Sequence, residues 1–176
     1  MPMTTRVMEI ATPLGEDVLL FHGMRAREEL GRLSEYHLDL LSADGEVDVD
    51  AILGKNVTIK LALPDDSTRY FNGYVTRFSQ GAVHGRYYQY TATVHPWLWF
   101  LTRTSDCRIF QEMTVPDIIK KVFADHGTAD FKLELTSSYR KWTYCVQYRE
   151  TDFNFVSRLM EQEGIYYYFR HTDGHN

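Results

Sequence analysis

Alternating apolar and polar positions run through the first hundred residues and predict a series of β-strands. The clearest stretch is 56–63, where every odd-numbered position is Val, Ile or Leu and the even-numbered positions are Asn, Thr, Lys and Ala. Side chains of a strand point alternately to its two faces, so this stretch predicts a strand with one buried face. The other strands predicted in this part of the chain are 6–11, 18–28, 34–42, 69–79 and 85–95.

Turn residues separate these strands. The acidic run ADGEVDVD (43–50) predicts a turn, and residues 50–54 predict one helical turn closed by Gly54. Pro-Asp-Asp-Ser (64–67) predicts a second turn, because Pro fixes φ and Asp bonds to nearby backbone. The strands 69–79 and 85–95 are expected to form a long antiparallel pair.

The pair 69–79 and 85–95 carries aromatic residues on both faces of each predicted strand. Aromatic residues make up 14% of the chain, with 12 Tyr and 10 Phe. Tyr is enriched in strands and at interfaces, where an apolar ring and a polar hydroxyl are both useful. Strands covered on both sides indicate a barrel wall that has a neighbour outside it.

The pattern changes to helical periodicity after Pro96. Residues 97–101 (WLWFL) are wholly apolar and predict a short helix packed against the barrel. The segment TVPDIIKKVFADHG (114–127) predicts a helix, because its apolar residues recur at the helical period. Thr114 is its expected N-cap, with Asp117 completing a capping box, and Gly127 is its expected end.

The C-terminal third mixes strands and one further helix. A polar, strand-like region is expected through Tyr139, followed by a strand at 143–148. Thr151 or Asp152 is expected to cap a helix that runs to Glu163 and ends at Gly164. Residues 165–170 (IYYYFR) are expected to form a last strand.

Composition excludes several classes of protein. The formal net charge of −5 argues against a nucleic-acid partner, which would normally meet a basic face. Neither GxxxxGK[ST] nor GxGxxG occurs, so no phosphate-binding loop is expected. No window reaches the ~20 apolar residues of a membrane helix, so no stable membrane insertion is expected. The start, MPMTTRVMEI, lacks the apolar core of a Sec signal peptide.

Groups that could carry catalysis are present, but their spacing does not favour it. Glu161 and Glu163 are two residues apart on the predicted helix, so their carboxylates diverge instead of facing one substrate. His171 and His175 have the i, i+4 spacing of two zinc ligands, but the HExxH glutamate is missing and Asp173-Gly174 disfavours a helix. The remaining histidines show no usable spacing: His22, His37, His84, His95 and His126.

Nucleophiles are likewise poorly placed. No GxSxG elbow occurs, and Cys145 is expected in mid-strand. A reactive thiolate needs a helix N-terminus or a basic neighbour, and Arg149 is four residues away. Cys107 and Cys145 are the only cysteines, and both are interpreted as reduced and mostly buried. We therefore predict no catalytic, cofactor-binding or metal-binding residues. Five charged residues lie around the last helix: Arg149, Glu150, Arg158, Glu161 and Glu163. Their simplest role is local pairing at the strand–helix–strand joint. The alternative is charge complementarity at a subunit boundary.

Five segments together resemble the N-terminal hub region of the VgrG family, the spike proteins of bacterial type VI secretion systems. They are REELGRLSEYHLDLLS (27–42), LGKNVTI (53–59), FNGYVTRFSQ (71–80), HPWLWFLTRTSDCRIFQEMTVPDIIKKVF (95–123) and YCVQYRETDFNFVSRLMEQEGIYYYFRH (144–171). The last two are long and rich in Trp, Cys, Tyr and Phe, so chance agreement is remote. The resemblance covers essentially the whole chain.

The resemblance implies a fold similar to the baseplate hub of contractile-tail phages. The expected fold class is α+β and β-rich, with hub-like β-barrel domains and inserted short helices. We expect an N-terminal barrel-like domain at 1–103 and a mixed α/β part at 104–176, with the second barrel incomplete because the sequence stops after YYYFRH. The family contributes no catalytic residues to this region.

The resemblance also implies partners and a location. It implies a homotrimer whose ring caps the hexameric tube protein Hcp, baseplate neighbours, and a PAAR tip and effectors carried by parts beyond this sequence. Such a protein is cytoplasmic before assembly and is then expelled into a target cell. Two alternatives stay open, a free-standing protein- or glycan-binding module and an accessory domain of a cell-wall hydrolase.

Overall fold

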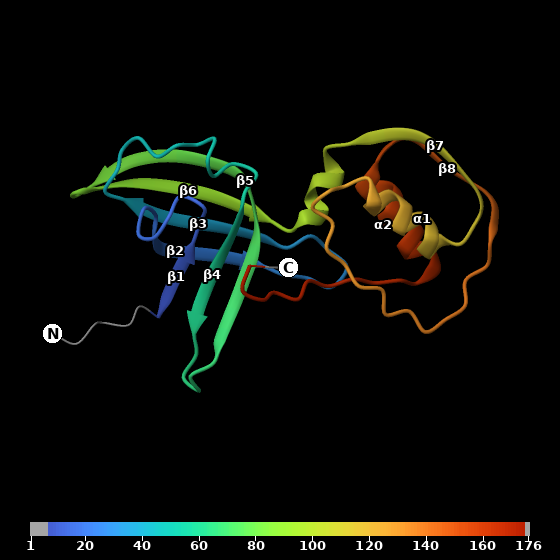
Figure 1. The fold of residues 1–176 in the computed structure, drawn as a ribbon, viewed down its shortest axis with the longest axis horizontal. Coiled ribbons are helices and arrows are strands. Elements are labelled where there is room, and N and C mark those ends of the chain that lie inside the picture. The colour runs from blue at the N-terminus through green and yellow to red at the C-terminus, as the bar shows by residue number, and fades with distance from the viewer. Residues whose placement is uncertain (1–6, 175–176) are drawn as a thin grey trace. The chain divides into compact units, whose positions relative to one another are not determined.

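The computed structural model describes residues 7–174, which form two compact units (Figure 1). Among these residues, the first unit comprises 7–96 and 169–174, and the second comprises Trp97–Tyr168. The expected division at residue 103 differs from these units, because residues 97–103 belong to the second and the last residues return to the first. Whether the units fold as separate domains stays a prediction.

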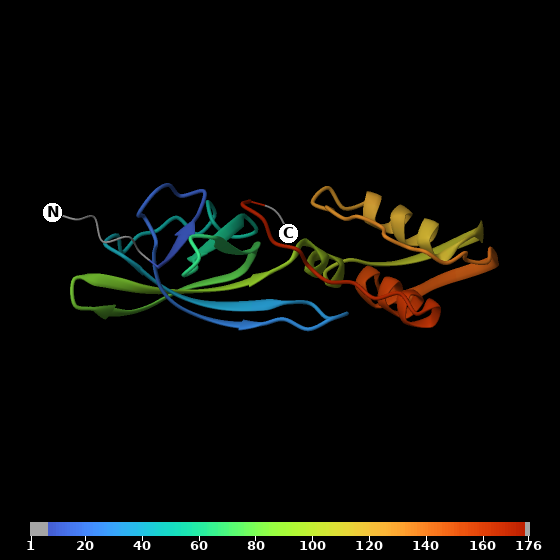
Figure 2. The same cartoon turned by 90° about the horizontal axis from the view of Figure 1, so that it is seen from below.

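A six-stranded antiparallel sheet makes up the first unit. Its order is β1-β4-β5-β6-β3-β2, and the two edge strands approach each other, so the sheet curls into a half-barrel (Figure 2). All six predicted strands of this part of the chain are confirmed, with ends shifted by a few residues. Their bounds are β1 Met8–Ala11, β2 Leu20–Arg27, β3 Glu35–Ser42, β4 Asn56–Ala62, β5 Thr68–His84 and β6 Tyr87–His95.

The apolar face of each strand lines the core of this half-barrel. In β3, Tyr36, Leu38 and Leu40 are almost fully buried, while His37 and Asp39 between them are exposed. β3 pairs with β6, and β6 pairs with β5, so one apolar layer continues across three strands. Bulges in β2 and β5 interrupt the register and increase the local bend of the sheet.

Gly73 allows β5 and β6 to approach each other closely. A Cβ atom at this position would lie 2.6 Å from the carbonyl oxygen of His95 and 2.8 Å from a methyl group of Val94. A side chain there would therefore push the two strands apart.

The second unit is built around a two-stranded antiparallel ribbon. It consists of β7 (Ser105–Met113) and β8 (Trp142–Thr151). The strand β8 was predicted, although shorter, but β7 was not. Its inward side chains are partly polar, and its exposed Ile109 gives it no one-sided apolar pattern.

Two helices pack on one face of this ribbon. They are α1 (Val115–Ala124) and α2 (Asp152–Glu163). Phe110 of β7 contacts both helices. Its ring stacks on the ring of Phe155 in α2, with 5.5 Å between the centroids, and its centroid lies 5.8 Å from the ammonium of Lys121 in α1. The segment 97–101 is confirmed as a short helix, the 3₁₀ helix η1 (Trp97–Thr102). It belongs to this unit, where Trp97 packs edge-on against Phe123 at 4.9 Å.

The helix caps follow the sequence. Thr114 accepts a hydrogen bond from the Asp117 amide, and Thr151, not Asp152, caps α2 by accepting from the Asn154 amide. Gly164 ends α2 in the left-handed conformation at φ 69°, as predicted. The helix α1 ends at Ala124, before the predicted Gly127, because Asp125 caps it with its amide bonded to the Val122 carbonyl.

Two predicted strands are wrong. The polar region that follows Gly127 and runs through Tyr139 forms no strand. Residues 165–170 form none either, although burial still alternates along them. A strand needs a hydrogen-bonded neighbour, and alternation alone does not supply one. No helix among residues 7–174 is long and apolar enough to cross a membrane.

Candidate functional site

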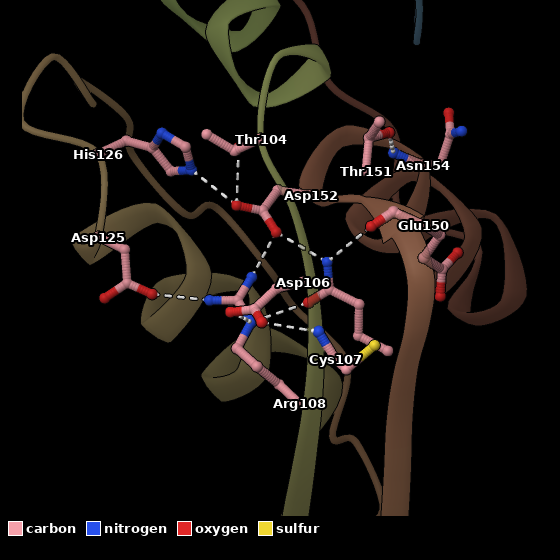
Figure 3. Close-up of polar contacts among 11 residues, drawn as sticks. Thr104, Asp106, Cys107, Arg108, Asp125, His126, Glu150, Thr151, Asp152 and Asn154 are labelled. Atoms are coloured by element: carbon pink, nitrogen blue, oxygen red, sulfur yellow. Dashed lines mark hydrogen bonds and ion pairs between the residues drawn. The ribbon is translucent and has the colours of Figure 1, made fainter.

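A buried cluster of polar side chains lies where β8 leads into α2 (Figure 3). Asp152, the first residue of α2, is at its centre and only 7% of its side chain is exposed. Arg108 comes from β7, Gln147 from β8, and Thr104 and His126 from the segments that precede β7 and follow α1. Four separate segments of the second unit therefore meet at one carboxylate.

Each oxygen of this carboxylate accepts two hydrogen bonds. Oδ1 accepts from the Gln147 amide at 2.7 Å and from the Arg108 guanidinium. Oδ2 accepts from the Thr104 hydroxyl at 3.0 Å and from Nε2 of His126, which therefore carries a proton, at 3.1 Å. A carboxylate has about four acceptor positions, so Asp152 is saturated.

Gln147 and Arg108 extend the cluster beyond Asp152. The Gln147 side chain is fully buried, accepts from Nε of Arg108 at 2.8 Å and donates to the Glu150 carbonyl at 3.1 Å. Arg108 also bonds Asp125 at 2.7 Å, near the surface. Both the oxygen and the nitrogen of the Gln147 side chain therefore have hydrogen-bond partners, as buried amides require.

The pKa of Asp152 lies below its ordinary value. Burial by itself raises this pKa, but hydrogen bonds from Gln147, His126 and Thr104 and the charge of Arg108 outweigh burial. The carboxylate is therefore ionised at neutral pH. With both oxygens saturated, it has no lone pair left to accept a substrate proton, and its contacts lock the strand–helix joint.

Among the charged residues around α2, Arg158 and Glu150 form the expected local pair. Arg158 binds Glu150 through Nη2 and also donates to the Val146 carbonyl at 3.3 Å. At the other end of the helix, the Trp142 indole donates to Glu163 at 3.3 Å. Arg149 lies over the ring of Tyr148 at 5.3 Å, and Glu161 is exposed.

A second cluster ties the C-terminal residues to the half-barrel of the first unit. Nδ1 of His171 accepts a hydrogen bond from the backbone N–H of Asn72 at 3.2 Å, so a neutral His171 carries its proton on Nε2. That proton points to the Tyr36 hydroxyl at 2.9 Å, and Tyr36 in turn donates to Glu28 at 2.7 Å. Burial lowers the pKa of His171 and raises that of Tyr36, which favours the neutral form of both side chains.

His171 therefore acts as an anchor in this structure. Asp173 adds a second tie, because it binds the Lys60 ammonium at 3.0 Å. His175, the other half of the considered zinc pair, lies outside the described residues. Between residues 7 and 174 no three His, Cys, Asp or Glu side chains converge to hold a metal ion.

A third cluster brings together histidines that looked scattered in the sequence. Glu35 binds Nε2 of His37 at 2.7 Å and Nε2 of His95 at 3.0 Å, and Nδ1 of His95 lies 2.8 Å from the Thr76 hydroxyl. The order hydroxyl–imidazole–carboxylate is that of a nucleophile, its base and an orienting acid. Thr76, however, sits in a bulge of β5 and also lies within bonding distance of the Thr93 carbonyl, at 3.2 Å. These contacts join three neighbouring strands, and we interpret them as structural.

The two cysteines differ in environment. Cys145 is buried and burial raises the pKa of its thiol, which is the opposite of an activated nucleophile. Cys107 is exposed, so the expectation that both are buried is wrong for Cys107. Both are free thiols.

Sequence reasoning missed the three clusters as units. It named Asp152 only as a possible cap and did not single out Arg108 or Gln147. These residues converge through the register of β7 on β8, which places Arg108 opposite Gln147. Since β7 was not predicted, the sequence carried no signal for that pairing, and the absence of catalytic, cofactor and metal residues stays a prediction.

Comparison with known proteins identifies the family to which this fold is similar. The family described as phage tail baseplate hub (GPD) matches residues 27–176. The chain is 58% identical over 167 residues to the type VI secretion system spike protein VgrG1c of Pseudomonas aeruginosa, covering 95% of this chain and 23% of that protein. It is 56% identical over 167 residues to VgrG1a of the same species, covering 95% of this chain and 26% of that protein.

A solved structure agrees with the sequence comparison. The Escherichia coli c3393 protein, described as a type VI secretion component similar to the T4 tail proteins gp27 and gp5, matches with a TM-score of 0.75 and 25% identity. The match covers 88% of this chain and 45% of that one. The hub-like fold and the resemblance to VgrG proteins are thereby confirmed, while the chain spans about a quarter of the length of these two curated relatives. The chain belongs to the phage tail baseplate hub family.

Proposed function

We propose that this chain is a structural part of a type VI secretion spike, in the hub that joins the spike to the tube behind it. The observation that carries the proposal is the 58% identity to VgrG1c across 95% of the chain. The family match over residues 27–176 includes β3 to β6 of the half-barrel, the ribbon and its two helices.

The proposed assembly is a ring of three copies that caps a hexameric Hcp tube. Baseplate proteins border this ring, and a PAAR tip and effectors belong to parts of a longer spike protein. The chain is made in the cytoplasm and leaves the cell with the contracting machine. In this role the chain needs rigid joints and contact surfaces, and the saturated Asp152 cluster supports such rigidity.

The proposed role is non-catalytic. Asp152, the most buried carboxylate of the second unit, has all four acceptor positions occupied, and the buried Cys145 thiol has a raised pKa. Both features remove reactive groups from use. They support a hub in preference to a hydrolase.

Native mass spectrometry of the chain mixed with purified Hcp tests the proposal. The expected complex holds three copies of the chain for each Hcp hexamer, and an unrelated hexamer of similar size serves as the control. Failure to bind Hcp under conditions where VgrG1c binds would overturn the tube-capping role.

The two alternatives predict other outcomes. A binding module predicts micromolar glycan binding by a monomer on a glycan array. An accessory domain of a hydrolase predicts glycan release that disappears when a single carboxylate is changed. Either result, together with no Hcp complex, would replace the hub proposal.

A further inference from the structure

The two strand–helix segments of the second unit repeat each other. β7 and α1 lie within residues 105–127, and β8 and α2 lie within 142–164. The helix starts, Val115 and Asp152, are 37 residues apart, and the two strands begin at the same separation. We call the two segments the halves of this unit, and two residues with this separation are counterparts.

Both halves pass from strand to helix through the same unusual backbone. Glu112 and Arg149 are counterparts, each two residues before a capping threonine, and their φ angles are 50° and 49°. Thr114 and Thr151 both accept a hydrogen bond from the backbone N–H three residues further along. The left-handed conformation is uncommon for residues other than glycine. Its occurrence at counterpart positions therefore indicates one local structure used twice.

The buried faces of the two helices also correspond. Four fully or almost fully buried residues of α1 have buried counterparts in α2; they are Ile118, Ile119, Val122 and Phe123, followed by Phe155, Val156, Leu159 and Met160. Between residues 109–127 and 146–164, only the capping threonines and the last glycines are identical. Sequence identity therefore does not reveal the repeat.

The register of the ribbon relates the halves by a local twofold axis. Ile109 pairs with Val146, which is its own counterpart, so the axis passes between these two residues. The pairs on either side are counterparts of each other: Arg108 with Gln147, and Phe110 with Cys145. In an antiparallel ribbon, this register makes the two strands equivalent under a half turn.

The Asp152 cluster breaks this symmetry (Figure 3). Its members Arg108, Gln147 and Asp152 have apolar counterparts, namely Cys145, Phe110 and Val115. The apolar three are as buried as the polar ones, with 4%, 3% and 0% exposure against 0% for Gln147 and 5% for Asp152. One side of the repeat therefore forms its strand–helix joint without any charge, so the fold itself does not require the polar cluster.

The charged contacts of the cluster run from one half to the other. Asp152 of the second half binds Arg108 and His126 of the first. If two second halves paired with each other, Asp152 would meet the counterparts of these residues, Cys145 and Glu163. A buried carboxylate would then face a thiol and another carboxylate, which is strongly unfavourable.

Pairing of two first halves fails for the same reason. Arg108 would lie against Val115, the counterpart of Asp152, and its guanidinium would lose the carboxylate that receives it. An ion buried without a partner costs far more free energy than the apolar contacts around it supply. The cluster therefore disfavours both pairings of like halves.

We propose that the second unit is a pseudo-twofold repeat, and that Arg108, His126 and Asp152 form a lock that lets each half pair only with the unlike half. Because the halves are alike, two copies that meet while folding can pair like halves, and only a contact that differs between the halves prevents this. The inference does not depend on the proposed hub role, because it concerns how the chain selects its own pairing.

Refolding of a symmetrised variant tests the lock. This variant carries Arg108→Cys, Gln147→Phe and Asp152→Val, which copy the apolar counterparts and keep the total side-chain volume similar. Wild type and variant are unfolded in urea under reducing conditions and refolded at several protein concentrations. Sedimentation velocity before and after refolding compares their assembly. Halves exchange between copies only in unfolded chains, so species that appear only after refolding do not come from surface contacts.

We expect the wild type to return to its original assembly at every concentration. The symmetrised variant should have a urea midpoint at or above that of the wild type, because apolar groups replace a buried ion pair. After refolding at high concentration, its fraction of new dimers and larger species should be at least about tenfold that of the wild type, because like pairing no longer buries an unpaired charge. Asp152→Val alone is the control, and it should lower the urea midpoint because Arg108 loses its partner.

A second measurement tests the repeat without touching the lock. Glu112→Gly and Arg149→Gly should each raise the urea midpoint, because glycine adopts a left-handed φ without strain. Gln111→Gly and Tyr148→Gly, at the preceding counterpart positions, are the controls. Both should lower the midpoint, because glycine weakens the interior of a strand.

The outcomes separate the lock, the repeat and the hub role. A symmetrised variant that refolds to the same species as the wild type at every concentration overturns the lock. One that does not fold also overturns it, because the polar cluster would then be a requirement of the fold. Opposite responses at Glu112 and Arg149 overturn the repeat. Binding of Hcp by the wild type decides the hub role independently of all these results.

Discussion

The half-barrel of the first unit and the ribbon of the second are both antiparallel sheets, but their outer faces have opposite chemistry. On β3, the outward positions include His37 and Asp39, which are hydrophilic. On β8, the outward positions are Tyr144, Val146 and Tyr148, which are apolar. The outer face of β3 is therefore hydrophilic, whereas the outer face of β8 gains free energy when it is covered.

The interiors of the two units differ in the opposite direction. The half-barrel encloses a continuous apolar cluster contributed by strands distant in sequence. The ribbon has an apolar side, where Phe110 stacks on Phe155, and a polar side held by Asp152 and Gln147. A polar cluster of this kind fixes geometry more than it adds stability, because burial of its charges opposes their attraction.

The largest expected effect comes from the apolar side of the second unit. Phe155→Ala should lower the free energy of unfolding by about 3–5 kcal/mol and Leu159→Ala by about 2–5 kcal/mol, because both side chains are fully buried. All three tryptophans, at 97, 99 and 142, belong to the second unit, so tryptophan fluorescence during urea unfolding reports on it selectively. A double variant as stable as the wild type would contradict the burial of this helix face.

The next largest effect compares the buried contacts of Asp152 with the exposed contact of Asp125. Asp152→Asn should lower the free energy of unfolding by about 1–3 kcal/mol, because the new amide group cannot accept the hydrogen bonds that one carboxylate oxygen receives. Asp125→Asn removes another carboxylate from the same Arg108, but Asp125 is 61% exposed, so a loss of about 0–1 kcal/mol is expected. Equal losses in the two variants would show that burial does not distinguish the two contacts.

Two glycine substitutions compare how closely neighbouring atoms surround the backbone in the two units. Gly73→Ala should destabilise the first unit by about 1–3 kcal/mol, because its Cβ would lie 2.6 Å from the His95 carbonyl oxygen. Gly127→Ala in the second unit should have little effect, since no atom lies within 4 Å of a Cβ built there. Urea unfolding followed by far-ultraviolet circular dichroism measures both, and a neutral Gly73→Ala would contradict the close approach of β5 and β6.

The sequence predicted the first unit better than the second, and the reason is the same difference between their faces. Strands with one apolar and one polar face, such as 56–63, show their alternation directly. The strand β7 was missed because exposed Ile109 and buried Phe110 place apolar residues on both of its faces. The three polar clusters depend on cross-strand register, as with Glu35 and His95, and a single sequence carries no record of which strands pair. The helix caps at Thr114 and Thr151 were predictable because capping is local.

The smallest effect is a difference in pH dependence between the two units. Burial lowers the pKa of His171 and of His95 in the first unit below the ordinary 6.5, so the unfolded chain binds protons more readily there than the folded chain. The first unit should lose stability as pH falls below about 6.5, by at most about 1.4 kcal/mol per pH unit for each histidine. In the second unit, the lowered pKa of Asp152 contributes stability that is present above 3.8 and lost only as pH falls below it.

His171→Gln separates these contributions. The glutamine side chain cannot take up a proton, so this variant should show a weaker pH dependence than the wild type between about pH 6.5 and 5.5. Protonation of His171 would also break the hydrogen bond that Nδ1 accepts from the backbone N–H of Asn72. Acid should therefore loosen the C-terminal residues from the half-barrel. Unfolding followed by far-ultraviolet circular dichroism at several pH values measures the slope, with tryptophan fluorescence as the parallel record of the second unit. An identical slope in His171→Gln would mean that the pKa of His171 is the same in the folded and unfolded chains, and that burial does not hold it below its ordinary value.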